Sequence, residues 1–261
     1  NYVYTNSNRI QQNSNTAGLL LGLLRTPPDF DNTIYKGTHV SATGVTTLNR
    51  HRSYRRYLGD NINPVWNNPL WTINEQKGLN DVHRFNASTN LNYSPSKYLQ
   101  LDFRGGMDTY IDERTDFWPV GSATDINGRI NKDNFRVSEI NFDAIARTDL
   151  PRVMENKIGV NATLGFNIND RIRKTTTTEA QALLVNTNLL NYSNTVGPYA
   201  ISDNFRQIRS NRLYGILSMD YDETVFLNLS GTQEAASSVN GTYFYPSADL
   251  AWQFTKHFGT Q

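Results

Sequence analysis

The chain has 261 residues, no cysteine and nearly balanced charge, with 25 Lys and Arg against 24 Asp and Glu and a net charge of +1. The lack of cysteine excludes a disulfide framework and a thiolate metal site, and the balanced charge gives no general attraction to nucleic acid, so we expect no nucleic-acid partner. The polarity comes from neutral side chains, including 32 Asn and 26 Thr, which suit wet sheet faces and long loops.

The sequence contains no candidate for a membrane-spanning helix. Its best apolar run, 17–24, is far shorter than the roughly 20 apolar residues that such a helix needs. The chain also begins without the charged segment, apolar stretch and cleavage site of a signal peptide. We therefore expect either a cytoplasmic protein or a mature or partial chain.

Eight segments alternate apolar and polar residues with a period of two, which predicts β-strands. In chain order they are 1–11, 81–93, 98–111, 136–148, 157–169, 211–221, 224–231 and 240–254. The last segment is typical, because Phe244, Leu250 and Trp252 share one face and Tyr245 and Asp249 share the other. Such strands have one apolar and one wet face, as in a soluble sheet or in a barrel with lipid outside and water inside.

The connections between these segments alternate between short and long. Only a few residues follow the second, fourth and sixth strands, whereas about 13–79, 112–135 and 175–205 form long loops. This alternation, with strands long enough to cross a bilayer, is typical of an outer-membrane barrel. The sequence predicts an all-β fold, an antiparallel transmembrane β-barrel with about eight strands in this chain. A large soluble β-sandwich or solenoid is the alternative.

The segment 212–254 carries a recognisable motif. Its first strand ends in a Tyr-Asp turn at Tyr221 and Asp222, and its last strand reads Gly241, Tyr245, Pro246, Ser247, Ala251 and Trp252. This pattern resembles the SusC/RagA-type TonB-dependent transporters of Bacteroidetes. The stretches 23–31 (LLRTPPDFD) and 68–71 (NPLW) are similar to the first long extracellular loop of that family. The stretch 231–238 departs from it, because GTQEAASS lacks the basic residue usual there.

The resemblance implies a barrel of about 22 strands filled by a plug, of which 1–261 would be a middle portion of one barrel domain, without the plug and the remaining strands. It also implies an outer-membrane location, a SusD-like lipoprotein partner, coupling to TonB through parts outside this chain, contact with outer-membrane lipid and lipopolysaccharide, and import of a glycan or peptide. No cofactor and no enzyme activity are expected.

Two groups of candidate contact residues follow from this topology. Aromatic and basic residues in the long loops could meet a substrate or partner, or could pack the loops together: Trp66, Trp71, Trp118, Arg52, Arg55 and Arg56. Polar residues on the wet strand faces are expected to line the lumen: Asp102, Arg104, Asp108, Asn161, Tyr245 and Asp249.

Other motifs are weaker. The four histidines have no metal-ligand spacing. Asp112, Glu113 and Asp116 could hold calcium where a strand enters a loop, although a solvated loop end is the simpler interpretation. The segment 178–192 predicts a short loop helix capped by Thr178.

Three functions remain open at this point. The first is TonB-dependent import with a lipoprotein lid. The second is a complete small outer-membrane porin or adhesin. The third is a soluble β-rich carbohydrate-binding protein or glycoside hydrolase, which would need two carboxylates about 5 to 9.5 Å apart in a cleft.

Overall fold

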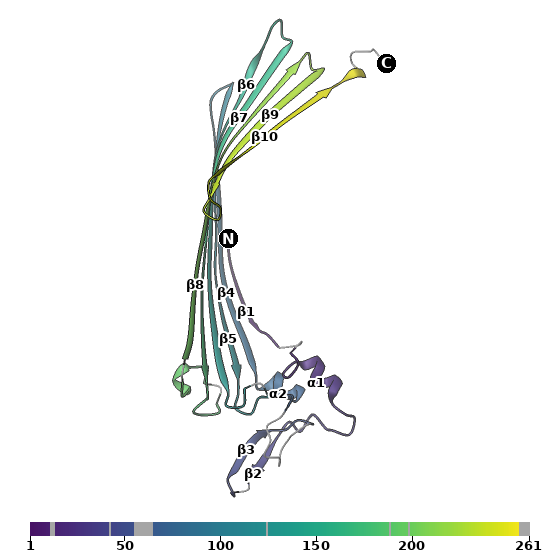
Figure 1. Cartoon of the computed structure of the whole chain (residues 1–261), viewed down its shortest axis with the longest axis vertical. Helices are drawn as coiled ribbons and strands as arrows, with labels where there is room; N and C mark the ends of the chain where they lie inside the picture. The colour runs from purple at the N-terminus through teal and green to yellow at the C-terminus, as the bar shows by residue number, and fades with distance from the viewer. Residues whose placement is uncertain are drawn as a thin grey trace.

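The structure is a computed structural model that describes residues 1–10, 14–41, 43–54, 65–123, 125–187, 189–197 and 199–255. It consists of one large antiparallel sheet with a small loop subdomain at one end (Figure 1). Arg55 and Arg56 lie outside the described residues.

The sheet has eight strands in the order β1-β4-β5-β6-β7-β8-β9-β10, so each strand pairs with its neighbour in the chain apart from an inserted subdomain between β1 and β4. The strand bounds are β1 Tyr2–Asn8, β4 Lys77–Ser96, β5 Leu99–Trp118, β6 Arg129–Val153, β7 Ile158–Gln181, β8 Tyr199–Tyr221, β9 Val225–Ala236 and β10 Thr242–Trp252. The eight predicted strands and their antiparallel order are confirmed.

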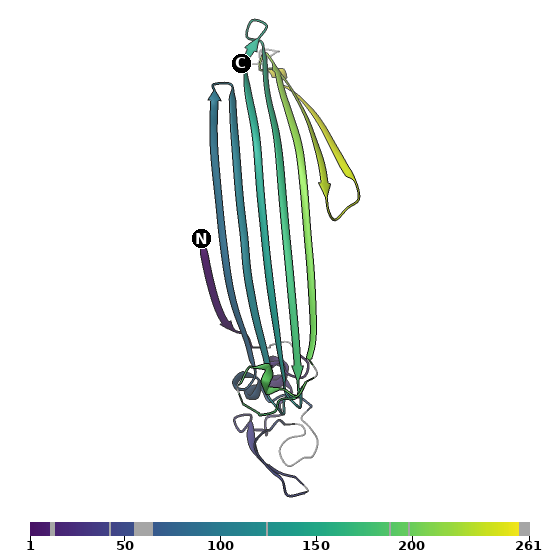
Figure 2. The same cartoon turned by 90° about the vertical axis from the view of Figure 1, so that its left-hand side faces the viewer.

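The strands are much longer than the period-two segments indicated. Five of them contain 20 to 25 residues, against about 5 to 6 in an average soluble strand, and they run side by side in Figure 2. The predicted long loops are therefore shorter than expected, because β5, β6, β7 and β8 continue into them. The β5–β6 connection is 119–128 and the β7–β8 connection is 182–198.

The predicted helix at 178–192 is wrong. Residues 178–181 belong to β7, with Thr178 opposite Ile201 of β8, and the described residues 182–187 and 189–191 contain no α-helix before a short 3-10 turn, Tyr192–Asn194. Pairing with β8 gives the backbone N–H and C=O groups of 178–180 hydrogen-bond partners, which an isolated helix would have had to supply within itself. The run of β-branched residues at 175–178 also favours a strand.

Tight turns close the strands at the end away from the loop subdomain. At the three-residue β8–β9 turn, Asp222 and Glu223 both have positive φ, near 50°, as the two central residues of a type I′ turn require, and the Thr224 N–H donates to the Tyr221 carbonyl at 2.9 Å. Asp220 accepts a hydrogen bond from the Glu223 backbone N–H at 3.2 Å, which helps hold a residue type that rarely adopts this conformation.

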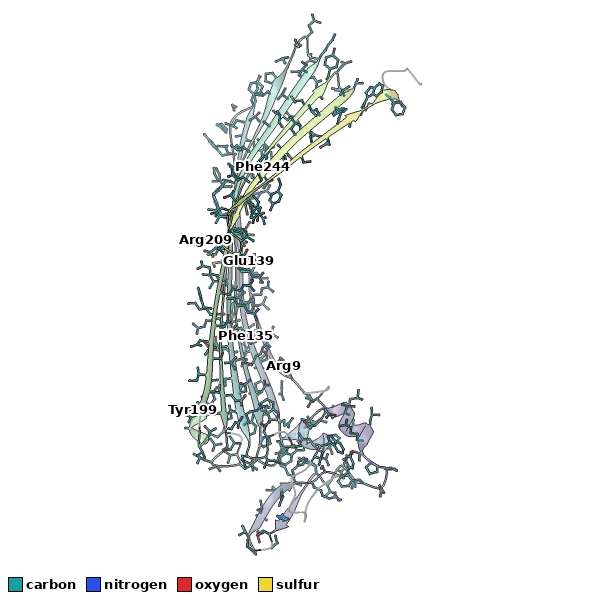
Figure 3. All side chains as sticks on the ribbon, viewed as in Figure 1. Arg9, Phe135, Glu139, Tyr199, Arg209 and Phe244 are labelled. Carbon is teal, nitrogen blue, oxygen red and sulfur yellow. The ribbon has the colours of Figure 1, made fainter. Side chains whose placement is uncertain are left out.

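The register sorts the strand side chains into two faces of different chemistry. One face, called the convex face, carries an apolar band near the tight turns: Leu91, Leu101, Phe103, Phe142, Leu164, Phe166, Leu213, Leu217, Leu229, Phe244 and Leu250. The other, called the concave face, carries Asp102, Asn141, Asp143, Asn167, Arg212 and Tyr245, among others. In Figure 3, Arg209 and Tyr199 lie on the side away from α1 and α2, while Glu139 and Phe135 lie toward them.

Little of the sheet is buried, because no second layer built from the described residues covers the length of either face. Leu164 is 57% exposed and Leu250 is 70% exposed. The buried apolar residues among those described lie at strand ends, in the loop subdomain or on the concave face of β6: Ala17, Trp71, Phe117, Ile130, Val137, Ile145 and Ala180. A contiguous apolar surface of this extent marks a face that contacts a membrane or another protein surface. Among the described residues, no helix has the length and hydropathy to cross a membrane.

Candidate functional site

The loop subdomain contains two short helices and a hairpin. α1 is Leu19–Arg25, α2 is Pro69–Asn74, β2 is Lys36–Val40 and β3 is Thr46–His51. It lies at the end of the sheet opposite the tight turns, on the concave side (Figure 1).

Asn68 joins three segments of this subdomain. Its side chain accepts from the Leu70 N–H at 2.9 Å, which caps α2, and donates to the carbonyls of Asn32 and Arg52, each at 3.1 Å. Its backbone N–H donates to Nε2 of His51 at 3.0 Å. The NPLW motif therefore serves to fold the loop, with Asn68 as N-cap and Pro69 at the first helical position.

His51 is buried and holds the subdomain to the sheet. Since Nε2 accepts from Asn68, Nδ1 carries the proton and donates to the Gly121 carbonyl at 2.9 Å in the β5–β6 loop. The ring stacks on Trp71, with centroids 4.4 Å apart. Burial lowers the pKa of His51 to about 4, and the hydrogen bond to Gly121 opposes this shift only in part.

The three tryptophans predicted in the loops occupy different environments. Trp71 is 1% exposed and its Nε1 donates to Ser122 Oγ at 3.1 Å, so this ring packs the loops together. Trp66 is half-buried, stacked on Tyr54 with the Arg25 guanidinium 4.8 Å from its ring. Trp118 is half-buried under Arg129 at 4.0 Å. Contact of these residues with a substrate stays a prediction.

Arg52 also has structural partners. Its Nη1 donates to the carbonyls of Asp31 at 3.2 Å and Ile34 at 3.0 Å, and its guanidinium lies 4.4 Å from the Phe30 ring. This arginine therefore closes the loop between α1 and β2, and a role in partner contact stays a prediction.

The acidic cluster is divided between the two faces of β5. Asp112 and Asp116 lie on the concave face and Glu113 on the convex face, because alternate strand residues point in opposite directions. Asp112 accepts from Arg114 and Glu113 accepts from Asn134. No group of three or more potential ligands that could hold a metal ion is found within the described ranges.

The six predicted wet-face residues all lie on the concave face, which the register establishes for each of them: Asp102, Arg104, Asp108, Asn161, Tyr245 and Asp249. Asp102 is 1% exposed and pairs with Arg147. The Arg84 guanidinium donates two hydrogen bonds to the Asp108 carboxylate, at 2.9 and 2.5 Å, and Asn228 donates to Asp249 at 2.8 Å. Whether this face lines a lumen stays a prediction.

The centre of the concave face is a polar groove that sequence reasoning did not single out. It has a volume of about 660 Å³ and is lined by Asn141, Asp143, Asn167, Asn169, Ser210, Arg212, Tyr214 and Thr232. Asn167 donates to Asp143 at 2.8 Å and to Asn141 at 3.1 Å. The sequence feature that could have indicated this groove is the recurrence of Asn at alternate positions of β6 and β7. Only the strand register, however, shows that these Asn side chains lie next to one another.

Carboxamides and ion pairs make this groove a surface for reversible contacts. Arg212 donates to Glu234 at 2.9 Å and Asn169 donates to Glu139 at 3.0 Å. An Asn side chain presents one acceptor and two donors, and so can exchange partners with any ligand that has amides or hydroxyls. Asp143 is the one carboxylate among the residues that line the groove, whereas glycoside hydrolysis uses two.

Comparison with known proteins gives a match by structure. No protein-family model matches the sequence, and no curated protein matches it. Among solved structures, the RagAB peptide transporter matches with a TM-score of 0.69 and 12% identity over 78% of this chain and 23% of that chain. The fold is similar to that of part of a RagAB transporter chain.

Two further RagAB structures give the same result. The peptide importer in its closed-closed state matches with a TM-score of 0.68 and 13% identity over 81% of this chain and 24% of that one. The peptide importer in its open-open state matches with a TM-score of 0.67 and 13% identity over 78% of this chain and 23% of that one. This chain thus spans about a quarter of the RagAB chains that it matches, and the fold expected from the resemblance is confirmed.

Proposed function

We propose that this chain is part of the barrel wall of a TonB-dependent outer-membrane importer that works with a SusD-like lipoprotein. The observation that carries the proposal is the two-sided sheet, which has a bare apolar band on the convex face and a hydrogen-bonded polar network on the concave face. The likeness to chains of a peptide transporter supports it.

The apolar band supports a bilayer as the environment of the convex face. On β7 it runs from Ile158 to Ile168, with six apolar residues at alternate positions. This gives 11 residues of strand, and a tilted membrane strand needs about 9 to 11. In water the same surface would be an aggregation site.

The polar groove supports a peptide or oligosaccharide as the cargo, and we favour a peptide. The carboxamides of Asn141, Asn167 and Asn169 match the donors and acceptors of peptide groups, and Arg212 and Asp143 can meet carboxylate and ammonium groups. Each contact is modest, which suits a transporter because the cargo must be released. TonB would supply energy through parts of the protein outside this chain.

The test is purification of the native protein from outer membranes, followed by intact mass measurement and identification of co-purifying chains. A mass of several times 29.7 kDa, with a lipoprotein bound, is expected. A lone chain of 29.7 kDa that needs detergent would instead indicate a small porin or adhesin. Extraction in buffer alone would contradict any membrane barrel.

A transport assay tests the function directly. Cells that carry the full-length protein should take up labelled peptides only when TonB is present. Equal uptake without TonB would contradict active import and favour a passive pore.

A further inference from the structure

Above the apolar band, two cations lie side by side on the convex face. Arg136 of β6 and Lys174 of β7 are direct partners in the antiparallel register, which places their Cβ atoms about 5 Å apart. On the outer sides of the pair, Ile111 lies opposite Arg136 and Phe205 lies opposite Lys174. The pair therefore has apolar neighbours on both sides and lies three same-face positions beyond Ile168, where the band on β7 ends, with Asp170 and Ile172 in between.

Neither cation has an anionic partner within the part of the chain that the structure describes. Both side chains are exposed. The Lys174 ammonium lies over the Phe205 ring, with Nζ 5.6 Å from the ring centroid. By contrast, other sheet arginines are ion-paired, for example Arg84 with Asp108 and Arg212 with Glu234.

Of three carboxylates near the pair on the same face, two are engaged elsewhere. Glu113 accepts from Asn134 at 3.0 Å, and Asp170 pairs with Arg209 and accepts from Gln207 at 2.8 Å. Asp203 lies opposite Thr176, one position beyond Lys174 on the same face, with no ion pair to a described residue. Like charges directly opposite one another destabilise a strand pair, so an external anion would relieve the repulsion.

We infer that Arg136 and Lys174 bind the phosphate groups of a phosphorylated glycolipid in the outer leaflet of the membrane. An Arg fork and a Lys ammonium are the usual protein ligands of phosphate. Long basic side chains at the edge of an apolar surface extend their charged ends toward the headgroup layer. This inference rests on the proposed function, because it needs the convex face to be in contact with lipid.

The apolar surface below the pair indicates a lipid and not a free phosphate ion. Ile140 and Ile172 lie on the same face, between the cations and the tight turns, beside Ser138 and the Asp170–Arg209 ion pair, and the apolar band begins beyond them. A lipid could place its headgroup on Arg136 and Lys174 and its acyl chains along this band, whereas a free anion would gain nothing from the band.

The test is native mass spectrometry of the detergent-purified full-length protein with two probes, bisphosphorylated lipid A and the same lipid after removal of both phosphates. Arg136→Gln with Lys174→Gln removes the site, and the exchange Arg136→Lys with Lys174→Arg keeps its charge. Lys97→Gln is the matched control, because Lys97 lies at the opposite, tight-turn end of the sheet.

The wild-type protein, the charge-keeping exchange and Lys97→Gln should retain the phosphorylated lipid, and the double Gln variant should bind it about tenfold more weakly. Equal retention by the double Gln variant, equal binding of both lipids, or displacement by excess inorganic phosphate would each overturn the inference. In each of these cases the protein should still require detergent for extraction, because the proposed membrane barrel does not depend on the lipid site. Extraction without detergent would instead contradict the proposed function itself.

Discussion

At the residue scale, close contacts between glycine and aromatic rings hold the strands in register. A Cβ added at Gly165 would come within 2.1 Å of the Tyr214 ring, and one at Gly231 within 2.9 Å of the Phe244 ring. Each ring lies close to a glycine of the neighbouring strand, where a larger residue would push it away. These glycines are thus explained by close approach and not by backbone conformation.

Replacing Gly165 by Val should therefore destabilise the sheet. The clash with Tyr214 forces a shift that costs about 1 to 3 kcal/mol, measured as a lower urea midpoint of the purified protein in lipid vesicles. The double variant Gly165→Val, Tyr214→Ala should recover part of the loss, because the ring that clashes has gone. Equal midpoints for wild type and Gly165→Val would show that the ring moves freely.

At the element scale, the loop subdomain depends on one neutral histidine. Protonation of His51 at Nε2 would oppose the Asn68 N–H that now donates to it, and so would weaken the cap of α2 and the tie to the β5–β6 loop. The groups around this ring are Lys36, opposite in the β2–β3 hairpin and paired with Glu75 at 2.6 Å, and the adjacent Arg52.

The stability of the loop subdomain should fall as the pH is lowered. The pKa of His51 is about 4 in the folded state and about 6.5 when unfolded. Because the folded pKa is the lower one, its contribution is complete above pH 6.5 and is lost between pH 6.5 and 4, up to roughly 3 kcal/mol. Hydrogen exchange of the amides of 68–74, compared at each pH with His51→Gln, measures this loss. Parallel pH profiles for the two proteins would exclude His51 as the cause.

At the scale of the whole molecule, the sheet has two faces of different chemistry. Seven of its strands, β4 to β10, carry apolar residues on the convex face near the tight turns and polar residues on the concave face, and the register aligns these sets from strand to strand. Opposite edges of the sheet, β1 and β10, each have one neighbour among the described strands. The proposed function predicts lipid on the convex face and water on the concave face.

Two adjacent positions on β8 test this arrangement. Leu217 lies in the apolar band, whereas Ser218 lies on the concave face opposite Asn161 and Asn228. Leu217→Lys should cost about 2 to 4 kcal/mol in a bilayer, and Ser218→Lys should cost little. The urea midpoint in vesicles compares the two variants. Similar losses at both positions would argue against lipid on the convex face.

The sequence by itself determined the strands, their order and the chemistry of each face. A period of two is visible in one strand alone, so Leu164 and Asn161 could be assigned to opposite faces without a partner strand. The sequence could not determine where the strands end. The polar parts of β6 and β7 near the loop subdomain are stabilised by pairing with neighbouring strands, and they show no apolar pattern that would indicate a strand. The error at 178–192 has this cause.

Only the tertiary structure decided which polar residues meet. The groove around Asn141, Asn167 and Arg212 and the opposed cations Arg136 and Lys174 come from different strands, and a shift of one residue in register would separate them. Likewise, burial of His51 and Trp71 depends on the β5–β6 loop, some 50 to 70 residues away in the chain. Pairing across strands and loops, which sets these distances, is a property of the folded chain as a whole.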